Sequence, residues 1–288
     1  MADDAHKPRS IITLTTDFGL SEHYVGAMKG AILGVNPRAI IVDVTHDVQP
    51  QRIEEGSFLL GAAWPYFPSG TVHVAVVDPG VGGERQALVL STPAGFFVGP
   101  DNGVLSCALP DAARPRRARR IAKRTPLPED CIAVAITNPQ YMLHPVSATF
   151  HGRDVFAPVA AHLTLGVDID SFGERVASIL ALPLLRAVRK TDGSLAGRVI
   201  HVDRFGNLVT SIRAVDVGGS DVTVEIAGEV VHGLANTYGD GDDLVALIDS
   251  SGYLEVALPR GSAAELLEAD LETPLSVRPV IVQMKRPQ

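Results

Sequence analysis

The first half of the chain alternates short apolar runs with segments of helical periodicity. Apolar runs rich in Val, Ile and Leu are typical of buried strands, and the breaker Asn36-Pro37 ends the first helical segment. Strands are predicted over 11–15, 39–44, 71–77, 87–91 and 95–98, and helices over 24–33, 53–63, 105–109 and 156–165. The last of these helices is expected to close a first domain.

Polar turns follow four of the predicted strands. Asp17, Asp47, Asp78 and Asp101 each stand in such a turn. Strands that feed helices in this way form an open sheet, and the ligands of such sheets lie beyond the carboxyl ends of the strands. We therefore expect a Rossmann-like open α/β sheet with these four aspartates near one edge.

The pattern changes after about residue 185, where short alternating strands separated by glycine-rich turns replace the helical segments. Strands are predicted over 196–202, 208–211, 222–226, 229–231, 244–248, 254–257 and 275–282, with a short helix over 263–267. This pattern predicts a small antiparallel β-barrel. We therefore divide the chain into an α/β domain, 1–188, and a β-barrel domain, 189–288.

Composition and charge narrow the class of protein. The 288 residues are 46% hydrophobic and 20% charged, which is ordinary for a globular protein. The net charge of −8 argues against nucleic-acid binding, which needs a basic surface. A basic run over 114–124 is the exception. Its simplest interpretation is a solvated helix face or surface loop, and an acidic partner is the alternative.

The cysteines and the apolar segments bear on location. Cys107 and Cys131 lack CxxC spacing, so neither a zinc site nor a disulfide framework is predicted, and a reducing compartment fits. The polar segment 1–9 holds no apolar signal core, and no run approaches the ~18 apolar residues of a membrane span. We expect a cytoplasmic protein that binds no membrane.

Two segments of the first domain carry candidate chemistry. Asp17 follows a strand, where a carboxylate can bind both hydroxyls of a ribose or simply close an Asx turn. Between Asp78 and Arg85, three glycines within four residues let the backbone approach a ligand closely. This loop is neither a dinucleotide-binding fingerprint nor a P-loop. Arg85 could fold back onto Asp78, although such a pair taken alone is an ordinary salt bridge.

His151 is the natural proton handler of the first domain, because the ordinary pKa of histidine lies nearest neutrality. A lone histidine is more often structural. The pair Arg153-Asp154 is expected to position its loop.

In the second domain, Phe205 can stack on a ring and Asn207 can pair with an adenine edge. Both lie close to Asp203, and Ser250 opens a turn whose hydroxyls and amides can hold a carboxylate. Each of these segments taken alone reads as an ordinary turn.

Six motifs occur in one order between residues 15 and 257: TTDFG, VVDPGVGGER, PDNG, TFHGRD, DRFGN and SSGYLEVA. In this combination the chain resembles the SAM hydroxide adenosyltransferases, relatives of the SAM-dependent chlorinases and fluorinases. The resemblance covers nearly the whole chain. It implies an α/β domain, a β-barrel domain and a homotrimer whose ligand lies between domains of neighbouring subunits. It also implies hydrolysis of S-adenosyl-L-methionine (SAM) to adenosine and L-methionine, with no cofactor and no metal.

The resemblance also implies roles for single residues. Asp17 would hold the ribose hydroxyls, Asp203 the methionine amino group and Ser250 the methionine carboxylate. Phe205 and Asn207 would meet the adenine.

Asp78, Arg85 and His151 match the Asp-Arg-His set that the family uses to activate water. The fluorinases carry tyrosine in place of the acid and the histidine, so the resemblance favours water over a halide. A buried carboxylate would also repel a halide. Arg85 stays protonated and cannot be the base. Either Asp78 or His151 would take the proton as water attacks C5′ in line with the sulfur.

Three alternatives stay open. A halogenase would release 5′-chloroadenosine, and a non-catalytic SAM- or adenosine-binding module would hold a nucleoside without turning it over. A metal-dependent nucleoside or phosphoester hydrolase would need oxygen and nitrogen ligands. The candidates for those ligands are Asp17, Asp43, His46, Asp47, Asp78 and His151.

Overall fold

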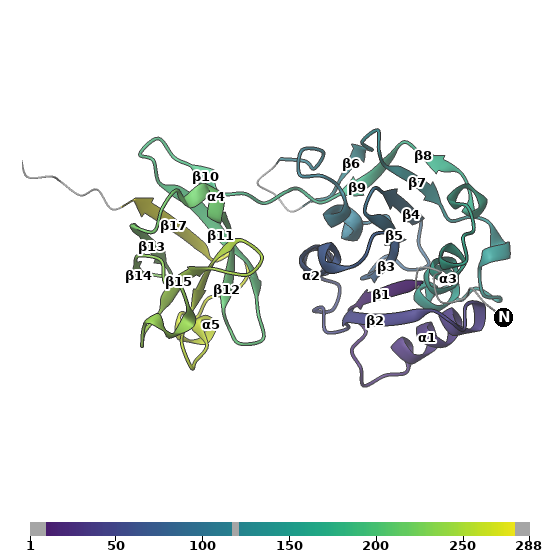
Figure 1. Ribbon diagram of the computed structural model, residues 1–288, viewed down its shortest axis with the longest axis horizontal. Coiled ribbons are helices and arrows are strands. Elements are labelled where there is room, and N and C mark those ends of the chain that lie inside the picture. Colours follow the sequence, from purple (N-terminus) through teal and green to yellow (C-terminus); the bar gives the residue numbers. More distant parts are fainter. Residues whose placement is uncertain (1–9, 117–120, 280–288) are drawn as a thin grey trace, which may run out of the picture. The chain divides into compact units, whose positions relative to one another are not determined.

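The computed structural model of the protein describes residues 10–116 and 121–279. The chain divides into two compact units, Met1–Leu184 and Leu185–Gln288. The first unit is a mixed sheet with helices and the second is an antiparallel β-structure (Figure 1). The fold class expected from the sequence, an α/β unit followed by a β unit, is therefore confirmed.

The first unit is built on a seven-stranded sheet with the order β2-β1-β3-β5-β4-β7-β8. The first four of these strands run parallel to one another, and the remaining neighbours pair antiparallel. The strands are β1 (Ile11–Thr16), β2 (Ile40–Thr45), β3 (Thr71–Val76), β4 (Ala87–Thr92), β5 (Gly95–Pro100), β7 (Ile132–Ala135) and β8 (Arg175–Val176). A separate two-stranded pair is formed by β6 (Lys123–Pro126) and β9 (Ser178–Ala181).

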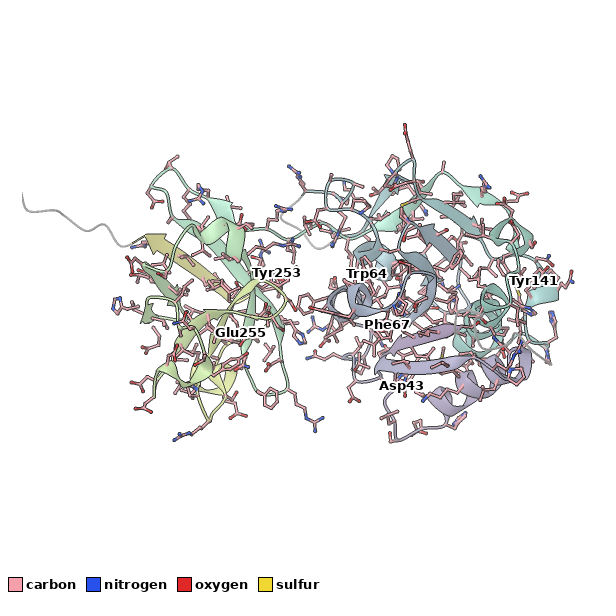
Figure 2. The ribbon with its side chains drawn as sticks, viewed as in Figure 1. Asp43, Trp64, Phe67, Tyr141, Tyr253 and Glu255 are labelled. Carbon is pink, nitrogen blue, oxygen red and sulfur yellow. The ribbon has the colours of Figure 1, made fainter. Side chains whose placement is uncertain are left out.

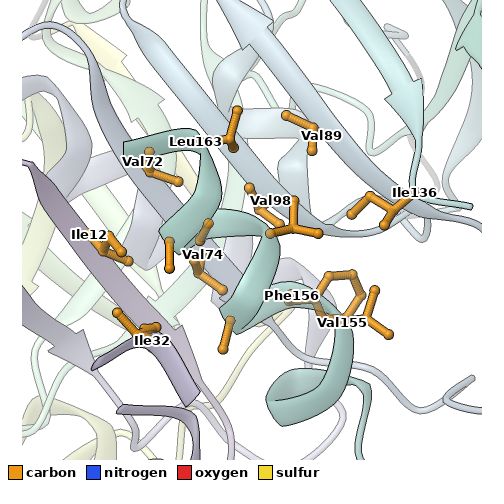
Figure 3. Close-up of a cluster of buried hydrophobic side chains, with 14 of the residues drawn as sticks. Ile12, Ile32, Val72, Val74, Val89, Val98, Ile136, Val155, Phe156 and Leu163 are labelled. Carbon is orange, nitrogen blue, oxygen red and sulfur yellow. The ribbon is translucent and has the colours of Figure 1, made fainter. Parts of the chain in front are cut away.

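Both faces of the seven-stranded sheet are covered, which explains the nearly continuous apolar runs of its strands. All six residues of β3 are buried. The helices α1 (Tyr24–Val35) and α3 (Ala157–Thr164) pack on one face, over alternate residues of β1 and β3 (Figure 3). On the other face lie α2 (Ile53–Ala63) and the 3₁₀ helix η2 (Val104–Ala108).

Aromatic rings extend this second layer. Trp64 begins η1 (Trp64–Tyr66), and its ring meets Phe97 edge-on with centroids 5.8 Å apart. Phe97 in turn stacks on the buried His73, and Phe67 meets His73 edge-on. Trp64 and Phe67 are labelled in Figure 2. Ring contacts therefore link η1 to β3 and β5 on this face of the sheet.

One predicted helix has an unexpected start. The helix expected over 156–165 begins with a π-helical turn, η4 (Gly152–Phe156), which continues into α3. Pro158 has no N–H to donate to the carbonyl of Asp154, and the N–H of Leu143 bonds to that carbonyl instead, at 2.8 Å. The expectation that this helix closes the first domain is wrong, because η5 (Ile169–Phe172), β8 and β9 follow it within the first unit.

The sequence pattern missed the strands β6 to β9, which are short. β6 is also polar, so it gives no apolar signal. The basic run over 114–124 lies partly outside the described residues, at 117–120. Its end opens β6, where Arg124 donates to the buried carboxylate of Asp101 at 2.5 Å. The charge pattern had indicated a solvated helix face or surface loop. This end of the run instead contacts a buried carboxylate.

The second unit is one antiparallel sheet with the order β14-β13-β17-β11-β12-β16-β15, and β10 lies beside β11. Just after β14, the N–H of Ala235 donates to the carbonyl of Ala246 in β15 at 2.8 Å, which nearly closes the sheet into the expected barrel. The strands are β10 (Val188–Arg189), β11 (Leu195–Val202), β12 (Leu208–Arg213), β13 (Val222–Ile226), β14 (Glu229–His232), β15 (Val245–Ile248), β16 (Tyr253–Ala257) and β17 (Pro274–Pro279).

Two short α-helices, α4 (Ala214–Val217) and α5 (Ala263–Leu266), and the 3₁₀ helix η6 (Tyr238–Asp240) also belong to the described part of the second unit. α5 agrees with the helix predicted over 263–267. The end of the last predicted strand, 280–282, lies outside the described residues. Among the described residues, none of the helices combines the length and the apolar character that crossing a membrane requires.

Candidate functional site

The carboxyl ends of four parallel strands meet at one edge of the first sheet. Asp47, Asp17, Asp78 and Asp101 follow β2, β1, β3 and β5 in that spatial order, each within one or two residues of the strand end. The edge predicted from the sequence is therefore confirmed. The surroundings of each carboxylate show whether it has a structural role or is accessible to a ligand.

Asp101 is turned inward and has a structural role. Its Oδ2 accepts a hydrogen bond from Arg124, and its Oδ1 accepts one from the backbone N–H of Leu180 at 2.6 Å. Leu180 lies in β9, so Asp101 ties the β6–β9 pair to the sheet. Its carboxylate oxygens are thus engaged by the protein itself.

Asp17 is only half-buried. Its Oδ2 accepts a hydrogen bond from the backbone N–H of Gln51 at 2.8 Å. Burial raises the pKa of Asp17, the bond from Gln51 opposes the rise, and the charge of Asp78 adds to it. The charge of Asp78 therefore acts on Asp17, and we assign both residues to one candidate site.

Arg85 joins Asp78 to His151. Its Nε and Nη2 donate to the Asp78 carboxylate at 3.0 and 2.5 Å, and Nη2 also lies 2.7 Å from Nδ1 of His151. The side chains of Arg85 and Asp78 are only 11% and 5% exposed, so water screens their pairing weakly. The guanidinium carbon also lies 5.4 Å from the ring centroid of Phe156, a cation–π contact. The expected return of Arg85 onto Asp78 is present.

The contact with Arg85 fixes the state of His151. Arginine only donates, so Nδ1 of His151 accepts, and the neutral imidazole carries its proton on Nε2. Burial and the charge of Arg85 lower the pKa of His151, against the opposing charges of Asp78 and Asp154. The histidine is therefore neutral near pH 7, with Nε2–H as its remaining donor.

Two loops hold this cluster, the glycine loop (residues 80–83) and the histidine loop (residues 147–151). Gly82 has a φ of +74°, and a Cβ placed on it would lie 2.2 Å from the carbonyl oxygen of Ala148. The backbones of the two loops are thus in direct contact at a position that only glycine fits.

The histidine loop is anchored at its base by Asp154. This fully buried carboxylate accepts hydrogen bonds from the N–H of Ser147 at 2.8 Å and from Nε of Arg153 at 2.6 Å. The loop-positioning pair Arg153-Asp154 that the sequence suggested is therefore confirmed.

Three aromatic rings connect the histidine loop to the turn that holds Asp17. Phe150 meets Phe18 and Tyr24 with ring centroids 5.8 and 5.1 Å apart. Phe18 follows Asp17 in the chain and Phe150 precedes His151. The rings therefore set the spacing between the two candidate polar groups.

In the second unit, Asp203 and Asn207 bind each other. Oδ1 of Asp203 accepts the backbone N–H groups of Phe205 and Asn207 at 2.8 and 2.9 Å, and Oδ2 accepts the Asn207 side-chain amide at 2.9 Å. A Cβ on Gly206 would lie 2.0 Å from Oγ of Ser262, so the turn packs tightly against its neighbour. The ring of Phe205 is 75% exposed beside the buried Asn207.

Ser250 is exposed in the turn between β15 and β16. The preceding residue, Asp249, holds the turn by accepting the N–H groups of Ser251 and Tyr253, both at 2.8 Å. The hydroxyl of Ser250 thus stands on a turn whose shape is fixed from within.

The sequence analysis missed Tyr238 and Glu255 as polar neighbours of this region (Figure 2 labels Glu255). Burial raises the pKa of the Tyr238 hydroxyl to about 12, and its hydrogen bond to Glu255 and the charges of Asp203 and Asp249 add to the rise. Burial also raises the pKa of Glu255, which is 3% exposed. An acidic residue inside the apolar run of β16 was the available signal.

The metal-ligand set considered from the sequence is not assembled. Within residues 10–116 and 121–279, no three His, Cys, Asp or Glu side chains are gathered to hold a metal ion. Asp43 instead pairs with Lys29 and His46, and His151 contacts Arg85. The predicted site residues fall into two groups, one in each unit. Asp17, Asp78, Arg85 and His151 form the first, and Asp203, Phe205, Asn207 and Ser250 belong to the second.

Comparison with known proteins covers both units. Residues 12–173 match the family model described as SAM hydroxide adenosyltransferase N-terminal domain, and residues 197–276 match its C-terminal domain. A protein of Salinispora arenicola named (R)-S-adenosyl-L-methionine hydrolase is 40% identical over 89% of this chain and 93% of its own length. A protein of Nocardia brasiliensis named fluorinase is 26% identical over 94% of this chain and 96% of its own length.

A solved structure has a similar fold. The crystal structure of an uncharacterized conserved protein from Thermotoga maritima superposes with a TM-score of 0.79 and 34% identity. The match covers 93% of this chain and 99% of that one. The two-unit architecture is therefore common to both proteins.

Proposed function

The chain belongs to the SAM hydroxide adenosyltransferase family, and we propose that it hydrolyses SAM to adenosine and L-methionine. One observation carries the proposal. Asp78, Arg85 and His151 combine a shielded carboxylate, a fixed cation and a neutral imidazole at the ligand-binding edge of an α/β sheet. The name of the Salinispora relative supports the same substrate.

In the proposed reaction, a water oxygen attacks C5′ of the ribose while the C5′–S bond breaks. The sulfonium leaves as the neutral thioether of methionine, and the water gives up one proton. A sulfonium is already a good leaving group, so the protein has two tasks. It must hold oxygen, carbon and sulfur in line, and it must orient and deprotonate the water.

We assign the role of base, which accepts the proton of the attacking water, to Asp78 rather than to His151. Nδ1 of His151 is engaged by Arg85, and Nε2 of the neutral ring already carries a proton. The imidazole can therefore donate to the water oxygen or to the ribose, but it has no lone pair left to act as a base. A carboxylate oxygen has more than one acceptor site, so Asp78 can accept from water while it stays paired with Arg85.

Arg85 is the electrostatic partner in this scheme. Its charge lies within hydrogen-bond distance of both other members, so it favours hydroxide-like character on a water held between them. It also fixes the His151 tautomer.

The remaining residues would bind the substrate. Asp17 would accept the ribose hydroxyls, because one of its oxygens is held in place by Gln51. In the second unit, Asp203 would bind the methionine amino group and Ser250 the carboxylate. Phe205 offers an exposed ring for the adenine. Asn207 has given only one N–H to Asp203, which leaves its Oδ1 and second N–H for the adenine edge.

Assembly and location follow the same proposal. We place the complete site at the meeting of the α/β domain (1–188) of one subunit with the β-barrel domain (189–288) of a neighbour in a homotrimer. The free thiols of Cys107 and Cys131 support a cytoplasmic location. SAM is the substrate, and no further cofactor enters the scheme.

The test is product analysis of the purified protein. The protein is incubated separately with the two sulfonium epimers of SAM, because the relative's name specifies (R). Each reaction is run in ¹⁸O-labelled water, with and without chloride. We expect adenosine and methionine in equal amounts, with the label at the 5′-hydroxyl.

Other products would identify the alternatives. Appearance of 5′-chloroadenosine would make the protein a halogenase, to which its fluorinase relative points. Bound nucleoside with no product from either epimer would make it a binding module. Unlabelled adenosine would exclude attack of water at C5′.

A further inference from the structure

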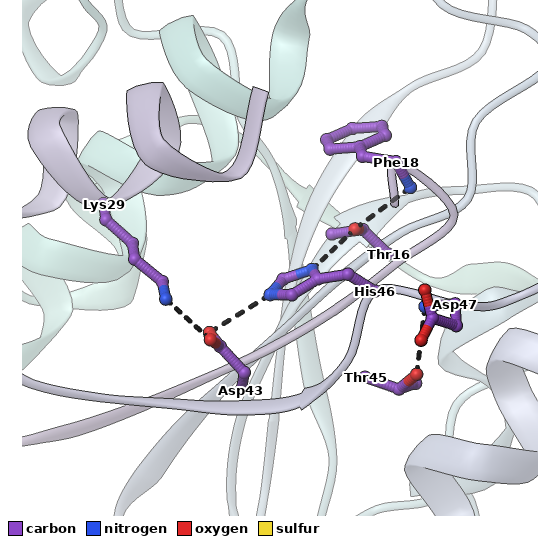
Figure 4. Close-up of polar contacts among 7 residues, drawn as sticks. All are labelled: Thr16, Phe18, Lys29, Asp43, Thr45, His46 and Asp47. Atoms are coloured by element: carbon purple, nitrogen blue, oxygen red, sulfur yellow. Dashed lines mark hydrogen bonds and ion pairs between the residues drawn. The ribbon is translucent and has the colours of Figure 1, made fainter. Parts of the chain in front are cut away.

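A second polar network includes Thr16 and Phe18, the residues on either side of Asp17 (Figure 4). Lys29 Nζ donates to Oδ2 of Asp43 at 2.6 Å, and His46 Nε2 lies 3.1 Å from Oδ1 of the same carboxylate. On its other side, Nδ1 of His46 lies 2.8 Å from the hydroxyl of Thr16. That hydroxyl accepts the backbone N–H of Phe18 at 3.3 Å. The network thus reaches from α1 to the residues on both sides of Asp17.

His46 connects two oxygen-bearing side chains. Its Nε2 faces the Asp43 carboxylate, which only accepts hydrogen bonds, although the two groups are not well aligned for one. Its Nδ1 contacts the Thr16 hydroxyl, which can donate and accept. The same hydroxyl oxygen accepts the N–H of Phe18. The contact with His46 therefore restricts the orientation of the Thr16 hydroxyl.

Burial makes this arrangement stiff. Thr16 is fully buried and His46 is 3% exposed, so water cannot replace a lost partner. Asp43 and Lys29 are partly exposed, which lets the far end of the network keep its charge in contact with solvent. Burial opposes ionisation of Asp43, but the bonds from Lys29 and His46 outweigh it and lower the pKa of Asp43.

Backbone hydrogen bonds also connect segment 46–51 to the Asp17 turn. The N–H of Gly19 donates to the carbonyl of His46 at 2.8 Å, and the N–H of Gln51 donates to the Asp17 carboxylate. The N–H of Val48 also donates to the carbonyl of Thr16 at 3.4 Å. Segment 46–51 therefore holds the Asp17 turn at four points: the Thr16 hydroxyl, the Thr16 carbonyl, the Gly19 amide and the Asp17 side chain. Of these, only the contact of the Thr16 hydroxyl depends on the side chain of His46.

We propose that His46 is a positioning residue that orients the Asp17 turn through Thr16 and thereby sets affinity for the vicinal diol of a nucleoside. The proposal rests on the proposed function, because Asp17 is there the ribose ligand. His46 does not touch the substrate. It acts on binding of the diol and leaves the rate of bond cleavage unchanged.

The test compares two ligands that differ only in the diol. Calorimetry gives the Kd of adenosine and of 2′,3′-dideoxyadenosine for the full-length protein and its variants. Thr16→Val keeps the shape of the side chain and removes the hydroxyl, Thr16→Ser keeps the hydroxyl, and His46→Gln changes the partner. His232→Gln, an exposed histidine in β14, is the matched control.

We expect Thr16→Val and His46→Gln to weaken adenosine binding about five- to tenfold, the effect of losing a buried hydrogen bond. Binding of 2′,3′-dideoxyadenosine should change less than twofold. Thr16→Ser and His232→Gln should retain the preference for adenosine. With SAM, the KM should rise in the two disrupting variants while kcat stays within about twofold, a split that general loss of structure would not produce.

Two outcomes overturn the proposal, and they can be told apart. If Asp17→Asn keeps the preference for adenosine, the diol is not bound by Asp17, and that part of the proposed function fails as well. If Asp17→Asn loses the preference while folded Thr16→Val and His46→Gln both retain it, only the role of His46 fails. Thermal unfolding of each variant establishes that it is folded.

Discussion

At the scale of single residues, the first unit shows how one arginine can decide the roles of two neighbours. Arg85 donates to both Asp78 and His151, so it keeps the carboxylate in place and takes the imidazole nitrogen that could have served as a base. The Asp78–Arg85 pair is shielded from water. The orientation of the two side chains is therefore fixed, in addition to their charges. A substitution that removes the charge of Asp78 and one that removes the imidazole of His151 should therefore have separable effects on activity.

The first prediction concerns Asp78. Asp78→Asn keeps the size and much of the hydrogen bonding to Arg85, but its amide cannot accept a proton from water. We expect kcat for adenosine formation to fall about 10²–10⁴-fold while the Kd for SAM changes little. Stopped-time chromatography and calorimetry measure the two quantities. Wild-type turnover in this variant would remove Asp78 from the role of base.

The second prediction concerns pH. Burial and the charge of Arg85 lower the pKa of His151 below its ordinary value of 6.5, so the neutral ring is present from neutral pH upward. As pH falls through the lowered pKa, a proton on Nδ1 would face the guanidinium and break the contact. We expect kcat to be level above about pH 6.5 and to fall at lower pH. His151→Gln should lose this acid limb; an identical profile in that variant would assign the limb to another group.

At the scale of elements, the cluster depends on loops that touch through their backbones. The glycine loop follows β3 and the histidine loop precedes η4, and the two meet where Gly82 faces Ala148. The sheet fixes where the first loop begins, and the buried Asp154 holds the start of the second one at Ser147. The relative position of Asp78 and His151 is therefore a property of this loop contact.

The third prediction tests the contact. In Gly82→Ala, the new Cβ would meet a backbone oxygen at 2.2 Å, at a positive φ that alanine adopts with strain. The loops must separate, so we expect a loss of about 1–3 kcal/mol in the free energy of unfolding and a kcat lowered about tenfold or more.

Gly30→Ala is the matched control, because Gly30 lies within α1, has an ordinary helical φ and has no atoms within 4 Å of its added Cβ. It should be neutral or stabilising by about 0.5–1 kcal/mol. Urea unfolding and steady-state kinetics measure both variants. If Gly82→Ala behaves like Gly30→Ala, the loop contact does not hold the cluster.

At the scale of the whole molecule, the candidate residues are split between two units. The α/β unit carries the groups proposed for chemistry and the ribose, and the β unit carries those proposed for adenine and methionine. Neither set alone would meet every part of SAM. Assembly is therefore part of the proposed activity, which makes it testable without a structure of the complex.

The fourth prediction uses mixed assemblies. Asp78→Asn and Asp203→Ala subunits, each inactive alone, are co-expressed with different tags and isolated as mixed species. If each site joins the α/β domain of one subunit to the barrel of the next, each isolated mixed trimer has one intact site out of three, and activity recovers to about a third of the wild-type value. Sedimentation should give a trimer. A monomer, or a mixture without recovered activity, would place each site within one chain.

The sequence by itself determined which segments form the core and which face one edge. The runs rich in apolar and β-branched residues predict β1, β3 and β5, because such residues dominate a strand buried on both faces, and the helix over 53–63 agrees with α2. Because strands of this kind are parallel, Asp17, Asp78 and Asp101 had to follow at one edge. Local periodicity is sufficient for these features, since they depend on burial alone.

Only the tertiary structure decided what each polar group at that edge does. Arg85 reaches a histidine 66 residues away, Asp101 turns inward to Arg124, and His46 contacts a hydroxyl on the neighbouring strand. None of these pairings has a local sequence signal, because hydrogen-bond partners are set by strand order and loop contacts across the sheet. The same holds for the π-helical start of α3, where Leu143 reaches the Asp154 carbonyl only in the folded chain.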